Sequence, residues 1–298
     1  MTSKITLCFT ILMLVQSFIA SAAMPITVQV AVNKKTAGDY QSTLKQTQKK
    51  AVELTAIDIK STGRGAISLI IFVQALDKAG FAVNFEFVIS PNSKRHDALV
   101  QSGAVLLAMR TLAQGYTPKD TLKSSPLLDS EHSLRGIYGL KSNHALMKIK
   151  TLEELRKFSA ITQHTWESDI KFLQGIELPQ LDLSHSKDSI FKHIAFRNAD
   201  FTILALTNYL SPDFQRKFGE ITLTPVPGLL IMRKEIYQFI IGEKHPDSQR
   251  IYQALEKGLG IMREQGLIKK YYQQDLPHRS DLPNWKILNH VDVGENEG

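Results

Sequence analysis

The region between Ile67 and Met109 has the clearest pattern of hydrophobic and polar positions in the chain. Two segments have the apolar spacing of helices, and each is followed by a glycine, Gly80 or Gly103, and then by an extended apolar run. Glycine is favoured where a helix ends because it adopts positive φ without strain. The pattern predicts a helix-strand-helix-strand unit of a parallel sheet with short loops. The expected elements are a helix over 67–79, a strand over 81–89, a helix over 94–102 and a strand over 104–109.

A similar succession of helices and strands returns after Thr151, whose spacing to Glu154 is that of a helix capping box. This second set predicts another small α/β layer, and an amphipathic helix near the end is expected to pack on the first one. The other expected strands are 26–32, 134–140, 160–165, 178–183, 200–206 and 229–232, and the other expected helices are 40–54, 151–158, 167–174, 189–198 and 248–273.

The first 23 residues differ from the rest of the chain, which has 298 residues and is 43% hydrophobic. Lys4 precedes an almost uninterrupted apolar run and a small-residue cleavage context, which is typical of a cleaved signal peptide. The run is short for a membrane span. The single cysteine, Cys8, lies inside it, so the mature chain is expected to have no disulfide, no thiol chemistry and no lipid anchor. A bacterial periplasm suits such a protein, and a disulfide-free secreted protein elsewhere stays open.

The formal charge is +7, and it becomes +6 when Lys4 leaves with the signal peptide. A scattered basic surface explains this charge, and attraction of anionic ligands or of an anionic membrane face is the sharper alternative. No nucleic-acid motif is present, so no polynucleotide partner is expected. The loop Ser61–Gly65 precedes a helix and can bind an anion through its amide groups, with Arg64 beside them. A flexible loop with a capped helix is the simpler interpretation.

Catalytic and metal-binding motifs find little support in the sequence. Ser42–Lys45 and Ser184–Lys187 both have the Ser-x-x-Lys spacing, but the Lys-Thr-Gly and Ser-Asp-Asn partners are missing, as is a Gly-x-Ser-x-Gly elbow. The nine histidines form no His-Glu-x-x-His pattern, and His185 and His193 are only a loose pair. We therefore expect neither an enzyme nor a metal or cofactor.

Several segments resemble the type II periplasmic solute-binding proteins, in particular the family 3 group that serves amino-acid importers. The segments that carry the resemblance are Ala98–Gly103 before a buried strand, Thr117-Pro118 and Ser125-Pro126 after it, Phe191–Ala205 with Asn198-Ala199-Asp200, and Leu255–Tyr271. The likeness extends over nearly the whole mature chain, but it lies in the order of elements more than in any single motif.

The resemblance implies an α/β fold of two lobes, each a mixed sheet flanked by helices, with the type II periplasmic-binding-protein arrangement. The expected segments are 1–23 for the signal peptide, 24–127 and 225–298 for lobe 1, and 128–224 for lobe 2. The lobes are expected to close by a hinge motion at two crossings, near 127–137 and near 222–226.

Two departures from the family concern its ligand. The family's arginine after the Thr-Pro position, which grips the carboxylate of an amino acid, is replaced by Lys119 and Asp120. The family's aspartate that takes the ammonium group corresponds to Ala205 or Leu206. Both halves of amino-acid recognition are therefore missing from the matching positions.

Two lobes that close on a ligand are expected to contact it from strand ends and helix starts. The candidate ligand-binding residues are Arg64, Arg110, Thr111 and Ser124 in the first lobe, and Trp166, Ser168, Thr207 and Asn208 in the second. Arg110 directly follows a buried run and can clamp a carboxylate, with a surface salt bridge as the alternative. Trp166 can stack on a ring or sugar, with packing at a helix start as the alternative.

The leading hypothesis is a monomeric periplasmic protein that captures a small polar or anionic ligand between two lobes and presents it to the permease of an ABC-type importer. The second hypothesis keeps the fold but makes the protein a sensor or adaptor that docks on a membrane signalling receptor. The third is an exported hydrolase with an unrecognised site.

Overall fold

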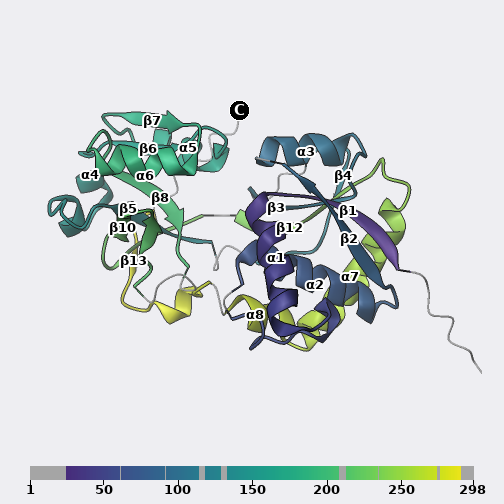
Figure 1. The fold of residues 1–298 in the computed structure, drawn as a ribbon. Helices are drawn as coiled ribbons and strands as arrows, with labels where there is room; N and C mark the ends of the chain where they lie inside the picture. The colour runs from purple at the N-terminus through teal and green to yellow at the C-terminus, as the bar shows by residue number, and fades with distance from the viewer. Residues whose placement is uncertain are drawn as a thin grey trace, which may run out of the picture.

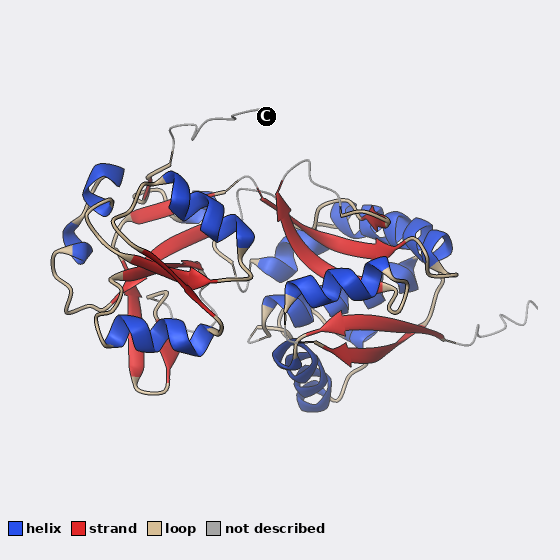
Figure 2. Ribbon diagram, turned by 90° about the horizontal axis from the view of Figure 1, so that it is seen from above, coloured by secondary structure: helices blue, strands red, loops and turns tan. Residues whose placement is uncertain are grey.

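The computed structural model describes residues 25–60, 62–90, 92–113, 118–128, 133–207, 213–233, 235–273 and 276–289. Two lobes lie side by side, and each has its own β-sheet flanked by helices (Figure 1 and Figure 2). This architecture confirms the expected α/β fold with two mixed sheets. The predicted signal peptide, residues 1–23, lies outside the described part. Within that part, each helix is too short or too polar to cross a membrane.

The first lobe is built on a five-stranded sheet with the order β2-β1-β3-β12-β4. β1, β2 and β3 run parallel, whereas β12 pairs antiparallel with both β3 and β4. The strands are β1 (Ile26–Val32), β2 (Val83–Ile89), β3 (Leu107–Ala113), β4 (Thr121–Lys123) and β12 (Glu235–Gly242). The helices are α1 (Lys34–Thr47), α2 (Arg64–Lys78), α3 (Ser93–Gln101), α7 (Ser248–Glu264) and α8 (Leu267–Tyr272), with a 3-10 turn at Ala51–Glu53.

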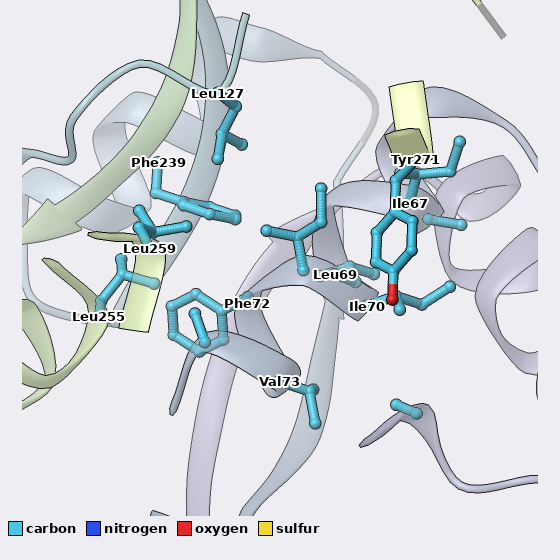
Figure 3. Packing of buried hydrophobic residues seen from close by; sticks show 14 of the residues in the cluster. Ile67, Leu69, Ile70, Phe72, Val73, Leu127, Phe239, Leu255, Leu259 and Tyr271 are labelled. Carbon is cyan, nitrogen blue, oxygen red and sulfur yellow. The ribbon is translucent and has the colours of Figure 1, made fainter. Parts of the chain in front are cut away.

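Helix α2 is the centre of the core of the first lobe because it is buried on all sides. Every residue from Ala66 to Leu76 is buried. Phe72 meets Phe239 of β12 edge to face, with the ring centroids 5.3 Å apart, and side chains of α7 cover the same region (Figure 3). Burial of these rings and aliphatic side chains fixes α2 and α7 on the sheet, and so fixes where the helices begin.

The second lobe is built on a sheet with the order β13-β11-β5-β8-β6-β7, to which β10 adds by pairing with β5, and β9 by pairing with β10. β6 runs parallel to β7 and β8, and β5 runs antiparallel to β8, β10 and β11. The strands are β5 (Leu134–Gly139), β6 (Ala160–Gln163), β7 (Leu181–Ser184), β8 (Phe201–Ala205), β9 (Arg216–Phe218), β10 (Ile221–Pro225), β11 (Leu229–Met232) and β13 (Lys286–Ile287). The helices are α4 (Leu152–Leu155), α5 (Glu167–Gly175) and α6 (Lys187–Ala195), with 3-10 turns at Leu146–Lys148 and Arg279–Asp281.

The helix-strand-helix-strand unit predicted from the sequence is confirmed as α2-β2-α3-β3, and Gly80 and Gly103 both have positive φ, at 90° and 77°. The prediction of one long closing helix over 248–273 is wrong, because Gly266 adopts a left-handed conformation and separates α7 from α8. Strand β12 was not predicted. It is buried along almost its whole length, so it lacks the alternation of apolar and polar residues that marks a half-exposed strand.

The chain crosses between the two sheets at three places, whereas the sequence predicted two. The crossings lie between Leu128 and Leu134, between Met232 and Glu235, and between Tyr272 and Lys286. The segment 222–226, where the second crossing was expected, instead lies in the second sheet, because β10 and β11 both pair with β5. β13 pairs with β11 and so also belongs to the second sheet. We propose that lobe 2 comprises residues 133–233 and 276–289.

A buried cluster of charged side chains joins the lobes where the first two crossings meet. Glu235, at the start of β12, accepts from Arg135 of β5 at 2.8 Å and from the Ser133 hydroxyl at 3.1 Å. Arg233 contacts Glu235 at 3.6 Å and pairs with Asp169 of α5. Two guanidiniums and two carboxylates balance one another there, which keeps the cost of burying them low. The cluster ties β12 of the first lobe to β5 and α5 of the second at the crossings.

We expect Gly258→Ala to destabilise the first lobe, because a Cβ at this position would overlap the backbone carbonyl of Ala75 where α7 crosses α2. Overpacking of this kind lowers the free energy of unfolding by about 2–3 kcal/mol, which urea denaturation measures. Gly260→Ala is the matched control, since it has no neighbour within 4 Å and alanine favours a helix by about 0.5–1 kcal/mol. Equal stability of the two variants would contradict this account of the helix contact.

We expect Glu235→Gln to destabilise the protein at neutral pH by about 3 kcal/mol, since it leaves two guanidiniums without one of their carboxylates. Burial raises the pKa of Glu235, but Arg135 and Arg233 outweigh burial, so its pKa lies below the ordinary value of glutamic acid. Its contribution to stability is therefore present above about pH 4.3, the pKa in the unfolded chain, and is lost as the pH falls through the lower folded pKa. Thermal unfolding between pH 3 and pH 7 tests this, with Glu220→Gln as the exposed control. Parallel pH profiles for the wild type and Glu235→Gln would contradict it.

Candidate functional site

The directions of the strands decide which edges of the two sheets face each other. β1, β2 and β3 end at the edge where β12 begins, and β6, β7 and β8 end at the edge where β5 begins. The first two crossings run between these edges, and Lys94 of α3 pairs with Glu167 of α5 at 3.0 Å across them. In open α/β sheets, ligands bind at the carboxyl ends of the parallel strands. Side chains between these two edges are therefore the candidates for ligand contact.

Arg216, the first residue of β9, carries a buried positive charge at this edge of the second lobe, with only 6% of its surface exposed. Its guanidinium donates to the carbonyl oxygen of Ala205, the last residue of β8, and to the Thr207 hydroxyl at 2.6 Å, just after that strand. The same group lies over the ring of Tyr138, 5.9 Å from its centroid. All of these partners are neutral. Among the described residues, Arg216 has no carboxylate partner, although a buried charge is normally paired.

Lys187 begins helix α6 beside Arg216. Ser186 caps this helix by accepting from the backbone amide of Ser189 at 3.1 Å. Lys187 is exposed by its accessible surface, and partial desolvation together with the nearby charges of Arg216 and Lys35 lowers its pKa. No ion pair of Lys187 occurs in the part of the chain that the structure describes. The positive N-terminal end of α6 and the cations Lys187 and Arg216 thus lie together.

The first lobe adds two more cations. Lys35, in the first turn of α1, pairs with Asp39, and both lie against Gly63, the residue that precedes α2. Arg64 begins α2, and its guanidinium lies 4.9 Å from the centroid of the Tyr237 ring. The first turns of α1 and α2 contain no acidic residue. We call Lys35, Arg64, Lys187 and Arg216 the cationic cluster.

The structure places the residues predicted from the sequence in different surroundings. Arg64 belongs to the cationic cluster. Thr207 accepts a hydrogen bond from Arg216 of that cluster. Trp166 and Ser168 lie at the start of α5 on the same edge of the second lobe, where Trp166 packs against the hydrophobic core. Ser124 lies within the first sheet, where its hydroxyl accepts from the amide of Phe239 at 3.1 Å and its amide donates to the carbonyl of Phe239.

The remaining three candidates can be placed only in part. Arg110 and Thr111 belong to β3, opposite Gln238 and Tyr237 of β12, but their side chains lie outside the described part of the structure. Asn208 lies outside the described residues altogether. Their assignment to a ligand site stays a prediction.

Sequence reasoning missed Arg216 and Lys187. Arg216 is nine residues after Thr207, and a short hairpin of β9 and β10 brings it back to the end of β8. No motif marks that return. Lys187 belongs to a Ser-x-x-Lys tetrad that was considered only for catalysis. The available signal was that Lys187 follows a strand and then Ser186, a serine that can cap a helix.

The described residues contain no group of side chains that could hold a metal ion. His164 and His185 lie beside each other at the ends of β6 and β7, with ring centroids 4.8 Å apart and planes tilted by 58°, but no third His, Cys, Asp or Glu of the described chain completes a metal site with them. A surface pocket lined by Leu140, Asn143 and Asp200 lies at the opposite edge of the second sheet, away from the cationic cluster.

No protein-family model and no curated protein matches the sequence. Solved structures match over most of the chain. The probable amino-acid ABC transporter extracellular-binding protein of Bacillus subtilis is 15% identical, with a TM-score of 0.57 over 84% of this chain and 97% of that one. The periplasmic VFT2 domain of BvgS from Bordetella pertussis is 12% identical, with a TM-score of 0.55 over 83% and 93%.

A third similar structure is an ancestral arginine-binding protein bound to arginine, 15% identical, with a TM-score of 0.52 over 83% of this chain and 97% of that one. At these identities the likeness concerns the fold. The fold expected from the sequence is therefore confirmed: the chain has the two-lobed fold of the type II periplasmic binding proteins.

Proposed function

We propose that this protein binds a small anionic ligand between its two lobes and delivers it to a membrane partner. The observation that carries the proposal is the guanidinium of Arg216, which is buried at the facing edge of the second lobe and whose partners among the described residues are neutral. A buried charge without a counter-charge costs several kcal/mol. An anionic group of a ligand would supply the missing charge through strong, charge-assisted hydrogen bonds.

The ligand site draws on both lobes in this proposal. Arg216 and Lys187 would hold the ligand on the second lobe, and Arg64, stacked on Tyr237, would reach it from the first. The crossings beside the Arg135, Asp169, Arg233 and Glu235 cluster would act as the hinge. The N-termini of α1 and α2, which have no acidic residue in their first turns, would also favour an anion through their backbone amides.

Delivery to the permease of an ABC-type importer is the role we favour, with a periplasmic location after removal of residues 1–23. The similarity to an extracellular-binding protein of a transporter supports this role. The similarity to a BvgS periplasmic domain favours a sensor or adaptor as the second candidate. Crosslinking in cells followed by mass spectrometry separates the two, since a permease would be recovered in one case and a signalling receptor in the other.

We expect small carboxylates or phosphates, and not neutral sugars, to raise the melting temperature in a thermal-shift screen. At 100 times the Kd, binding adds about 2.7 kcal/mol, which corresponds to about 5 °C or more for a chain of this size. Arg216→Gln is expected to weaken this binding at least about tenfold, because it removes a charge-assisted interaction of about 1.5–3 kcal/mol.

Arg250→Gln is the matched control for Arg216→Gln. Arg250 lies on α7 with its guanidinium 5.0 Å from the centroid of the Phe81 ring, just before β2 and so at the opposite edge of the first sheet. This variant is expected to bind like the wild type. If Arg216→Gln keeps full affinity for every anion that stabilises the wild type, the assigned site is wrong.

A further inference from the structure

The segment 49–60, which connects α1 to α2, exposes two large hydrophobic side chains. Ile57 is 84% exposed and Val52 is 40% exposed. The other three exposed large hydrophobic residues of the described chain lie singly on separate elements. Exposed apolar residues that lie singly are common on protein surfaces. Two of them on one short segment call for an explanation if that segment is firmly held.

Buried hydrogen bonds hold this segment against α2 and α8. The side-chain amide of Gln74 on α2 donates to the carbonyl oxygens of Ala51 and Leu54, each at 2.9 Å. The hydroxyl of Tyr271 on α8 lies 3.0 Å from the same Leu54 carbonyl oxygen. Leu54 and Ile59 are buried in the core of the first lobe. The segment is therefore anchored on both sides of its exposed part.

Asp58 stabilises the turn from which Ile57 projects. Its carboxylate accepts from the amide and the hydroxyl of Thr55, both at 2.8 Å, and from the ammonium group of Lys49 at 2.8 Å. The backbone amide of Asp58 donates in turn to the Thr55 carbonyl at 3.1 Å. The exposure of Ile57 is thus a feature of an ordered turn.

The same part of the surface is basic. All lysines of the stretch 45–60 are exposed: Lys45, Lys49, Lys50 and Lys60. The acidic residues of this stretch are Glu53, which accepts from the backbone amide of Lys50 at 2.9 Å, and Asp58, which pairs with Lys49. No other ion pair of these lysines occurs among the described residues. Three ammonium groups beside the exposed apolar side chains therefore have no carboxylate partner there.

We infer that the segment 49–60 docks the first lobe on an anionic membrane surface. Lysines near such a surface are attracted by its anionic headgroups, and an exposed apolar side chain gains free energy when it enters the boundary between headgroups and acyl chains. A partner that offers negative charge alone would use the lysines and leave Ile57 in water, whereas an anionic lipid surface engages both. The docking is peripheral and reversible, and it does not depend on the proposed ligand site.

Co-sedimentation with lipid vesicles tests the inference. Residues 1–23 are themselves apolar, so the experiment uses a chain that starts at Met24 and contains both lobes. We expect binding to vesicles of phosphatidylcholine and phosphatidylglycerol in equal parts, weakening as salt rises, and no binding to phosphatidylcholine alone. Ile57→Ser is expected to weaken this binding at least about tenfold, because it removes the apolar side chain that leaves water. Joint substitution of Lys50→Gln and Lys60→Gln is expected to weaken it at least about tenfold as well.

Matched substitutions in the second lobe are the controls. Phe196→Ser removes an apolar side chain that is 74% exposed, and Lys171→Gln together with Lys217→Gln removes two exposed positive charges. These variants are expected to bind anionic vesicles like the wild type. Because every substituted side chain is exposed, we expect melting temperatures close to that of the wild type, which thermal unfolding without lipid checks.

Three results would overturn the inference: no binding of the wild type to anionic vesicles, equal binding to both kinds of vesicle, or equal losses in the control variants. Binding only to native membranes that contain proteins would also overturn it, because the partner would then be a protein. None of these results concerns Arg216 or its ligand, so each of them leaves the proposed function in place.

Discussion

The buried guanidinium of Arg216 is the interaction on which this account depends. Protein interiors tolerate a charge when a partner of opposite charge or a set of well-placed hydrogen bonds compensates it. Here the Thr207 hydroxyl, the Ala205 carbonyl and the Tyr138 ring fix the orientation of the guanidinium, and no carboxylate of the described chain compensates its charge. Such a group is costly for stability, and a role in binding an anion gives a physical reason for it.

The rest of the fold positions this charge. Pairing of β9 with β10, and of β10 with β5, brings Arg216 to the end of β8, while the core around α2 sets where Arg64 begins its helix in the other lobe. The balanced charge cluster around Glu235 contrasts with Arg216, which has no carboxylate partner among the described residues. The first cluster ties the lobes together at the crossings, and Arg216 is where we propose that an anion binds.

Much of the fold follows from sequence patterns because local chemistry determines it. Alternation predicted β1 and β2, and Gly80 and Gly103 marked the helix ends where φ is positive. β12 was not predicted, because a strand buried on both faces has no alternation of apolar and polar residues. The break at Gly266 was not predicted either, because glycine alone does not specify a helix end. Membership of β11 in the second sheet depends on long-range pairing with β5, which no local pattern encodes.

The candidate site was predictable only in outline. Strand ends and helix starts pointed to Arg64 and Thr207, both of which lie at the cationic cluster. The resemblance to the periplasmic solute-binding proteins also implied that their ammonium-binding aspartate corresponds to Ala205 or Leu206 here. The sequence could not show that Arg216 donates to the Ala205 carbonyl, because that contact depends on the return of a hairpin.

The central claim, that the lobes close on an anion held by Arg216, is tested most directly by the distance between the lobes. Cys8 is the only cysteine of the sequence, so in a Cys8→Ser background Lys50→Cys in the first lobe and Lys217→Cys in the second, both exposed, can carry a pair of spin labels. Pulsed electron resonance is expected to show a shorter and narrower distance distribution when a binding anion is added, and no change in the Arg216→Gln background. A distribution that stays the same when the wild-type site is saturated would contradict the account.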